Sequence, residues 1–196
     1  MIRAVFSGLV VAAGFFFGAS AFAQADPENV LVIEIAGANE GIVEIELLPD
    51  LAPEHVARVK ELARTGAYDN VVFHRVIPGF MAQTGDVEHG TREAFSNGRA
   101  GTGGSAMPNL PAEFSDEPYL EGIVGMARAQ NPNSANSQFF IMFAPAPFLN
   151  GQYTVFGRVT EGMDVVHGIK PGTQAANGVD IDDPDFMRRV TVKADQ

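Results

Sequence analysis

The stretch FHRVIPGFMAQ, residues 73–83, carries the most information about this chain. Its first half mixes valine and isoleucine with polar residues, which predicts a strand, and the Pro78-Gly79 pair ends it. Alternation places Phe73, Arg75 and Ile77 on one face of that strand. A lone arginine on an apolar strand usually extends its charged end into water. Arg75 therefore indicates a site only if other segments supply apolar walls around it.

Two later segments supply such walls. Residues 137–141 read SQFFI and residues 148–153 read FLNGQY, and both combine large apolar side chains with an amide. Together with residues 73–83 they predict an apolar pocket that holds one guanidinium and a few amides. We find no nucleophile, general base or metal-ligand set in this group.

The usual catalytic motifs are missing from the sequence. The chain has no cysteine, which excludes disulfides, zinc–thiolate sites and catalytic thiols. Its four histidines are dispersed and form neither HxH nor HExxH, and there is no GxSxG. The GTGG at 101–104 lacks the Lys-Ser/Thr of a phosphate-binding loop, and the acidic segment 182–185 lacks EF-hand spacing. We therefore expect neither a metal nor a cofactor.

Composition narrows the class of protein further. The 196 residues include 24 acidic and 13 basic side chains, which gives a formal net charge of −11. Because phosphates repel such a chain, we expect no nucleic-acid partner. With 46% apolar and 19% charged residues the chain is too hydrophobic for intrinsic disorder. Its length favours one domain with a sizeable core.

Most of the remaining chain has the pattern of strands. Residues 29–35 and 42–47 alternate apolar and acidic side chains, which predicts a hairpin around the turn GANEG at 37–41. Apolar residues three or four apart predict a helix over 54–65, with proline before it and Gly66 after it. Further strands are predicted at 71–77, 122–127, 138–144, 153–159 and 190–193, a short helix at 163–169, and loops at 87–105 and 171–184. This order predicts a closed β-barrel with helical plugs.

The first 23 residues have the composition of a targeting segment. Arg3 is the only charge before Asp26, residues 4–17 form an apolar run, and the small-x-small triplets ASA (19–21) and AFA (21–23) follow. This order is typical of a secretory signal peptide. We expect cleavage after Ala23, with Ala21 as second choice, which leaves residues 24–196 as an exported domain. The alternative is an uncleaved anchor, because about 20 apolar residues can span a bilayer.

Five motifs occur in order along the chain: FHRVIPGFMAQ (73–83), GTGG (101–104), MARA (126–129), NSQFF (136–140) and VFGRV (155–159). In order and spacing they resemble the cyclophilin family of peptidyl-prolyl cis–trans isomerases, especially its exported bacterial members. The resemblance covers about residues 29–193. It implies a mainly-β fold, an eight-stranded antiparallel closed β-barrel capped by two α-helices. It also implies a groove on the outer face of the barrel that binds proline peptides.

The resemblance also assigns roles to single residues. It implies that Arg75 is the catalytic arginine, assisted by Gln83 and Phe80, and that Gln83 bonds the substrate backbone and helps to hold Arg75. Arg128 is expected to act through its backbone N–H and C=O, which any residue except proline can supply. The proline-ring pocket, its flanks and its rim are assigned to Phe80, Met81, Ala127, Arg128, Ala129, Phe140, Phe148, Leu149 and Tyr153.

The chain departs from the family pattern at a few of these positions. Phe148 stands where many members have tryptophan, and Tyr153 where many have histidine. Both remain aromatic, so we expect activity to survive, but loss of the indole N–H predicts weak cyclosporin binding. Arg128 occupies a position that is often asparagine, and Thr84 one that is often glycine. The segment 87–98 is longer than in minimal members and is interpreted as an inert loop, with gating or client contact as alternatives.

The resemblance therefore implies a peptidyl-prolyl cis–trans isomerase with no cofactor and no metal. We expect its partners to be proline-containing unfolded or exported polypeptides. We expect the mature protein to be a monomer in the periplasm or the medium, with no stable membrane association after cleavage. Two alternatives remain: a holdase chaperone or proline-peptide binding module on the same fold, and a structural subunit of a larger assembly. The second is weaker, because such subunits often lose the arginine.

Overall fold

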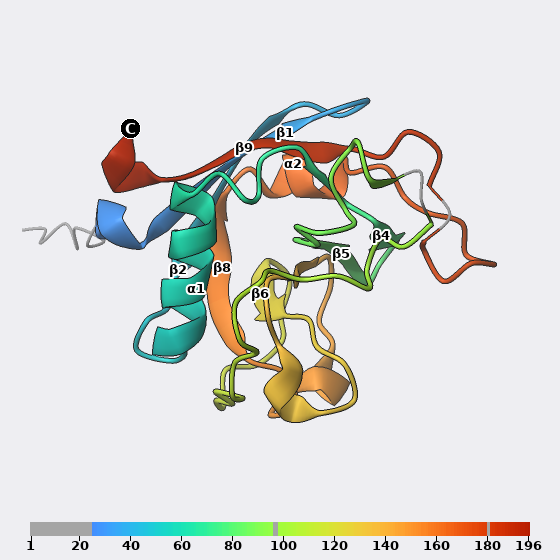
Figure 1. Ribbon diagram of the computed structural model, residues 1–196. Coiled ribbons are helices and arrows are strands. Elements are labelled where there is room, and N and C mark those ends of the chain that lie inside the picture. The colour runs from blue at the N-terminus through green and yellow to red at the C-terminus, as the bar shows by residue number, and fades with distance from the viewer. Residues whose placement is uncertain (1–24, 96–97, 180) are drawn as a thin grey trace, which may run out of the picture.

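The computed structural model describes residues 25–95, 98–179 and 181–196. Its main element is one antiparallel sheet of nine strands in the order β3-β9-β1-β2-β8-β6-β7-β5-β4 (Figure 1). Two helices, α1 (Pro53–Arg64) and α2 (Met163–His167), pack against this sheet. The strands are β1 (Val30–Ala36), β2 (Gly41–Leu47), β3 (Val71–Val72), β4 (Arg75–Ile77), β5 (Met81–Thr84), β6 (Ile123–Met126), β7 (Phe139–Met142), β8 (Val155–Glu161) and β9 (Phe186–Val192).

The two edges of the sheet are joined by a short piece of chain. β3 and β4, which stand at opposite ends of the strand order, are separated only by Phe73 and His74. The sheet therefore curls round until its edges meet. β3 pairs with β9 and β4 pairs with β5, so the predicted strand 71–77 exists as two halves with different partners. This division turns the eight expected strands into nine, and the mainly-β prediction with two helices is confirmed.

The division at residues 73–74 also changes which side chains share a face. Phe73 is fully buried in the main core together with Val76, whereas Arg75 is only half-buried and faces the outer side. Ile77 packs against a second cluster instead. The prediction that Phe73, Arg75 and Ile77 share a face is therefore wrong for Phe73. Strict alternation fails because the chain changes strand partners between residues 72 and 75.

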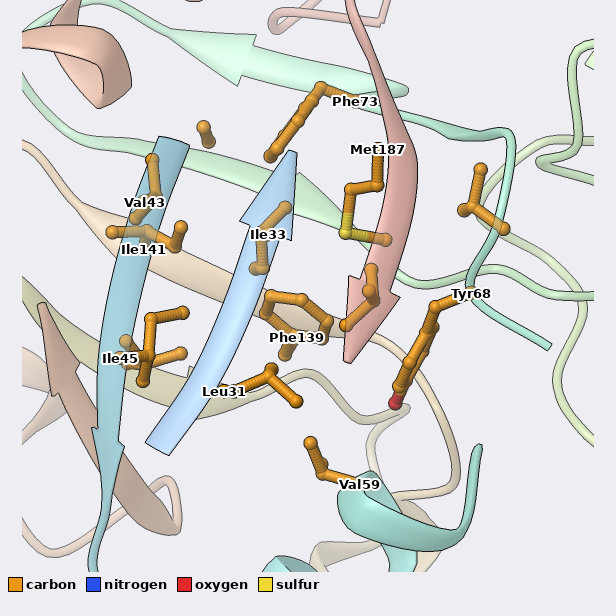
Figure 2. Packing of buried hydrophobic residues seen from close by; sticks show 14 of the residues in the cluster. Leu31, Ile33, Val43, Ile45, Val59, Tyr68, Phe73, Phe139, Ile141 and Met187 are labelled. Atoms are coloured by element: carbon orange, nitrogen blue, oxygen red, sulfur yellow. The ribbon is translucent and has the colours of Figure 1, made fainter. Parts of the chain in front are cut away.

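Apolar side chains from the inner face of the curled sheet form the main core (Figure 2). Tyr68 is the largest of its fully buried residues. Its hydroxyl donates to the Ser137 carbonyl at 2.8 Å, so the buried phenol has a hydrogen-bond partner. Helix α1 closes the core with Val56, Val59 and Leu62, the face predicted from their spacing. The labelled core members are Leu31, Ile33, Val43, Ile45, Val59, Tyr68, Phe73, Phe139, Ile141 and Met187.

Helix α1 is capped by a residue distant in sequence. Ala52 at its N-cap position has no side chain that could bond the free N–H groups. The Glu113 carboxylate accepts instead from the backbone N–H of Glu54 at 3.2 Å and of His55 at 3.1 Å. Glu113 also lies 2.6 Å from Nδ1 of the buried His55 ring. A negative group at this end also suits the helix dipole.

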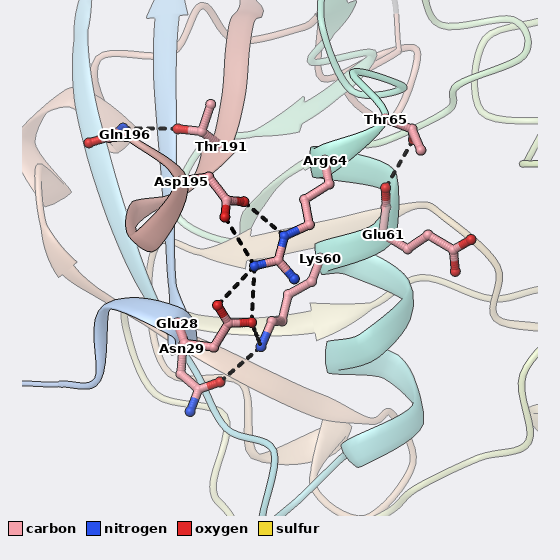
Figure 3. A network of polar contacts seen from close by, with 9 residues as sticks. All are labelled: Glu28, Asn29, Lys60, Glu61, Arg64, Thr65, Thr191, Asp195 and Gln196. Atoms are coloured by element: carbon pink, nitrogen blue, oxygen red, sulfur yellow. Dashed lines mark hydrogen bonds and ion pairs between the residues drawn. The ribbon is translucent and has the colours of Figure 1, made fainter.

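Charged side chains tie both ends of the described chain to α1 (Figure 3). The Arg64 guanidinium donates to Glu28 in the short helix η1 (Pro27–Asn29) and to Asp195 in the short helix η5 (Lys193–Asp195). Lys60 pairs with the same Glu28 at 2.8 Å. The hydrogen bonds from Arg64 and Lys60 lower the pKa of Glu28 to about 2. One guanidinium thus joins the first and the last short helix.

Most predicted elements are present within a few residues of their expected bounds. Strand β9 starts four residues earlier than predicted, at Phe186. Strand β5 was not predicted, because four residues directly after a Pro-Gly turn show too little alternation to distinguish a strand from a loop. The expected signal peptide, residues 1–23, lies outside the described residues. Among the described residues, no helix has the length and apolar character needed to cross a bilayer.

Candidate active site

A groove of about 420 Å³ opens on the outer face of the sheet. Strand β4 contributes Arg75, and its hairpin partner β5 contributes Met81 and Gln83. Strand β7 contributes Phe140, which lies opposite Gln83 in the sheet. The complete lining is Arg75, Phe80, Met81, Gln83, Ala127, Arg128, Phe140, Phe148, Leu149, Gln152 and Tyr153. The structure therefore brings together ten of the eleven residues assigned to the site from the sequence.

The eleventh residue, Ala129, lines a neighbouring hollow of about 490 Å³. Its other walls come from residues 101–105 and from side chains around Asn136 and Gln138. Gln83, Ala127 and Arg128 line both hollows, so the two adjoin, and we call them together the depression. The described part of the segment 87–98 lines neither of them.

Hydrogen bonds hold Arg75 at one end of the groove. Its Nε donates to the Asn177 carbonyl at 3.1 Å, and its Nη1 donates to Oε1 of Gln83 at 3.4 Å. Burial lowers the pKa of Arg75 below its usual value, but an arginine stays protonated throughout the physiological range. The groove therefore presents a fixed cation with N–H groups left free for a ligand.

A relay of side-chain amides orients Gln83. Its Nε2 donates to Oε1 of Gln138 at 3.0 Å, and Nε2 of Gln138 donates to the Gly103 carbonyl at 2.8 Å. Because each amide donates in one direction, Gln83 must present its oxygen to Arg75. The loop at residues 101–104 thus sets the orientation of the arginine through two amides.

The same loop is held by a fully buried carboxylate, Asp86, directly after β5. One oxygen accepts from the backbone N–H of Glu88 at 3.1 Å and of His89 at 2.8 Å. The other accepts from Gly101 at 2.7 Å and Gly103 at 2.9 Å. Burial alone would raise the pKa of Asp86, but these four N–H groups outweigh it and hold the pKa below its ordinary value.

Aromatic rings form the apolar floor of the groove. Phe140 stacks on Tyr119 with ring centroids 5.8 Å apart and meets Tyr153 edge-on at the same separation. Gly125 lies directly below, and a Cβ placed there would be 2.7 Å from Cζ of Phe140. Only glycine at this position lets the ring lie flat in the floor.

The rim of the groove is more exposed. Phe148 retains 65% of its surface and tilts against Phe80 with centroids 5.7 Å apart. The Arg128 guanidinium lies 4.4 Å above the Tyr153 ring and donates to the Gln152 carbonyl at 2.9 Å. The sequence assigned only the backbone of Arg128 to the site, but its side chain is part of the wall as well.

Sequence reasoning missed four contributors to the site. Gln138 was quoted in SQFFI but given no role, although its amide connects Gln83 to the loop. Gln152 lines the groove, Asn177 supplies a carbonyl to Arg75, and Asp86 secures the loop. Nothing in the sequence separates Asp86 from the other acidic residues, because its burial is seen only in the structure. A backbone carbonyl such as that of Asn177 leaves no trace in sequence.

Comparison with known proteins shows the family of the chain. The family model for cyclophilin type peptidyl-prolyl cis-trans isomerases matches residues 30–192. The chain belongs to this family. A probable peptidyl-prolyl cis-trans isomerase of Brucella suis is 59% identical over 172 residues, covering 87% of this chain and 86% of the relative. Peptidyl-prolyl cis-trans isomerase B of Bacillus subtilis is 41% identical over 132 residues, 66% of this chain and 84% of the relative.

Solved cyclophilin structures share the fold. A cyclophilin from Hirschia baltica has a TM-score of 0.71 at 28% identity, covering 88% of this chain and 76% of that one. A cyclophilin type isomerase of Cryptosporidium parvum, solved in the presence of the dipeptide Ala-Pro, has a TM-score of 0.69 at 26% identity. It covers 83% of this chain and 98% of that one. The predicted family and enzyme class, a peptidyl-prolyl cis-trans isomerase, are thus confirmed.

Proposed function

We propose that this cyclophilin isomerises X–Pro bonds in exported polypeptides and that Arg75 lowers the barrier. The observation that carries the proposal is a guanidinium, fixed by Gln83 and the Asn177 carbonyl, at the edge of an apolar groove. Such a groove suits a proline ring, and the guanidinium would lie beside the imide nitrogen of that proline. The segment 1–23 supports export, because its composition is that of a signal peptide.

The reaction needs no bond to break. Resonance gives the peptide bond a rotation barrier of about 18–20 kcal/mol, and uncatalysed X–Pro exchange takes tens to hundreds of seconds. As the bond twists, the imide nitrogen becomes pyramidal and regains its lone pair. A guanidinium N–H aimed at this nitrogen binds the twisted form more strongly than the planar one. Differential binding of this kind is what accelerates a reaction.

The magnitudes require more than the arginine. A ~10⁵-fold acceleration corresponds to about 7 kcal/mol, whereas one preorganised donor contributes roughly 3–4 kcal/mol. Apolar contacts of Met81, Phe140 and Leu149 with the ring supply the rest of the barrier reduction, because they hold the proline while the preceding residue rotates. Water is excluded from the imide at the same time, which strengthens the charge–lone-pair interaction.

A prolyl isomerisation assay on protein lacking residues 1–23 tests the mechanism. We expect Arg75→Ala to lose most of kcat/KM, and Arg75→Lys to lose nearly as much because an ammonium lacks the planar fork. Gln174→Ala serves as a control with unchanged rates, because Gln174 lies three residues before Asn177 but does not line the groove. Equal rates in Arg75→Ala and the wild type would overturn the role of the arginine.

Two further measurements test export and the chaperone alternative. N-terminal sequencing of protein from the periplasmic fraction should start at Gln24, and a cytoplasmic chain starting at Met1 would contradict export. In an aggregation assay with an unfolded, proline-free client, we expect no protection by the wild type. Protection that persists in Arg75→Ala would favour the holdase chaperone instead.

A further inference from the structure

The groove carries two arginines whose charges no acidic residue neutralises. Neither Arg75 nor Arg128 forms an ion pair with any described residue, a property they share with several arginines outside the groove. The linings of the groove and of the adjoining hollow contain no Asp and no Glu. This is unusual in a chain with 24 acidic and 13 basic residues. The depression is therefore a positive region on an acidic protein.

Two acidic residues, Asp86 and Glu88, lie behind the loop, but neither lines the groove or the neighbouring hollow. The Asp86 carboxylate is fully buried and bonded to four backbone N–H groups, so it does not face the hollow. Glu88 is exposed and lies 3.4 Å from the His89 ring. A peptide in the depression therefore meets cations and amides.

Arg128 is held in position for contact with a ligand. Its Nη1 donates to the Ala129 carbonyl at 2.9 Å and the Gln130 carbonyl at 3.3 Å. Its Nη2 and Nε donate to the Gln152 carbonyl at 2.9 and 3.3 Å, its charge lies over the Tyr153 ring, and one Nη2 N–H is left for a ligand. These partners are neutral, so they fix the guanidinium without pairing its charge. A side chain already immobilised loses little further entropy when it binds an anion.

The position of Arg128 defines which part of a substrate it meets. It lines both the groove, where Arg75 and the apolar floor accept the proline, and the neighbouring hollow. A residue next to the proline passes Arg128 when the peptide continues from the groove into the neighbouring hollow. A carboxylate on that residue would meet the guanidinium at short range.

Resting on the proposed function, we propose that Arg128 makes this isomerase select substrates with an acidic residue within two positions of the proline. Arg128 is a specificity-determining residue in this scheme, and Arg75 performs the chemistry. An ion pair at a partly exposed site is worth up to about 1 kcal/mol, which corresponds to a preference of about threefold to fivefold in kcat/KM.

A peptide series tests the proposal. Each of the two positions before and after proline is set in turn to Glu, Gln or Lys, and kcat/KM is measured at about 0.15 M salt, where the Debye length is about 8 Å. Screening matters because the net negative charge of the protein repels acidic peptides at long range. We expect a Glu-over-Gln ratio of about three to five at one position at least, with Lys disfavoured at the same position.

Three variants assign the effect. Arg128→Gln should bring the Glu-over-Gln ratio near one, and Arg128→Lys should retain most of it. Arg188→Gln is the matched control, because it removes one positive charge from β9, where Arg188 pairs with Glu34 outside the groove. It should keep the wild-type ratio. If Arg128→Gln does not fold, the proposal is tested by the Glu-over-Gln ratio of the wild type and by its retention in Arg128→Lys.

The outcomes separate this inference from the function on which it rests. A wild-type ratio near one at all four positions would overturn it, and so would a preference that Arg128→Gln leaves intact or Arg188→Gln abolishes. In each of those cases the isomerase activity itself stands. Failure to accelerate any peptide, whatever its charge, would overturn the proposed function and this selectivity together.

Discussion

Replacing Asp86 by asparagine should damage catalysis from a position outside the groove. The change keeps the shape of the side chain but converts one acceptor oxygen into an NH₂ donor. That NH₂ would face either the N–H pair of Gly101 and Gly103 or the pair of Glu88 and His89. Donor would oppose donor, and the loop at 101–103 would move away from its place.

The stability loss follows from the bonds involved. Hydrogen bonds to a charged group contribute about 1.5–3 kcal/mol each. Asp86→Asn removes two of the four outright and weakens the other two, so the free energy of unfolding should fall by roughly 3–5 kcal/mol before relaxation. Chemical denaturation with urea, monitored by tyrosine fluorescence, measures this loss.

The catalytic loss follows from the amide relay. A displaced Gly103 carbonyl frees Gln138, which frees Gln83 to rotate, so Arg75 loses its Oε1 partner. Loss of one orienting hydrogen bond costs about 1–1.5 kcal/mol, which is about a tenfold fall in kcat. KM should change little, because the apolar floor does not contact Asp86. Steady-state isomerisation kinetics separate the two constants.

Asp69→Asn is the matched control for this prediction. The Asp69 carboxylate also accepts a backbone N–H, that of Val190 at 3.0 Å in β9, which is not a member of the relay. It should lose some stability and keep kcat. If Asp86→Asn does not fold, Gln138→Leu breaks the relay at its next member and should lower kcat similarly. Wild-type kcat in a folded Asp86→Asn or in Gln138→Leu would refute the relay.

Three further predictions concern other parts of the molecule. Burial lowers the pKa of His74 to about 4, so its neutral form stabilises the fold above pH 6.5 and this contribution is lost as pH falls towards 4. The unfolding free energy of His74→Gln should therefore depend less on pH over that range, and an identical slope in the two proteins would contradict this. Gly125→Ala places a Cβ 2.7 Å from the Phe140 ring. Such overpacking should lower the free energy of unfolding by about 1–3 kcal/mol, measured by urea unfolding, and should raise KM, measured by steady-state kinetics. An unchanged KM would show that the ring position is not critical. Glu113→Ala removes the cap of α1 and should lower stability by about 1–2 kcal/mol with kcat unchanged, so a large kcat loss would connect α1 to the groove.

The walls of the groove could be predicted from the sequence because they lie in short contiguous motifs. Arg75, Met81 and Gln83 come from one hairpin, and Phe140 from an apolar run short enough for a buried strand. In such motifs an arginine predicts the charged group and large apolar side chains predict the walls of a pocket. The pairing of β5 between β4 and β7 then brings them together.

The polar supports of the site could not be predicted in the same way. The relay from Asp86 to Arg75 depends on hydrogen bonds between segments that are far apart in sequence, and on the direction of two amides. Alternation also failed at residues 73–74, because a change of strand partner leaves no mark in a two-residue window. Ala129 lies three residues beyond the end of β6 and lines the neighbouring hollow, a position that the motif alone does not indicate.

The polar network around Arg64 has a consequence for engineering the protein. Glu28 and Asp195 meet on a single guanidinium, so the two ends of the described fold lie within a few side-chain lengths of each other. Both lie at the end of the molecule opposite β4 and β5 (Figure 1). A short Gly-Ser connector could therefore join them, and new termini could be opened in an exposed loop away from the groove, giving a circular permutant. Attachment of a fluorophore, an affinity tag or a second domain at either end of the described fold would leave the groove accessible to long polypeptides.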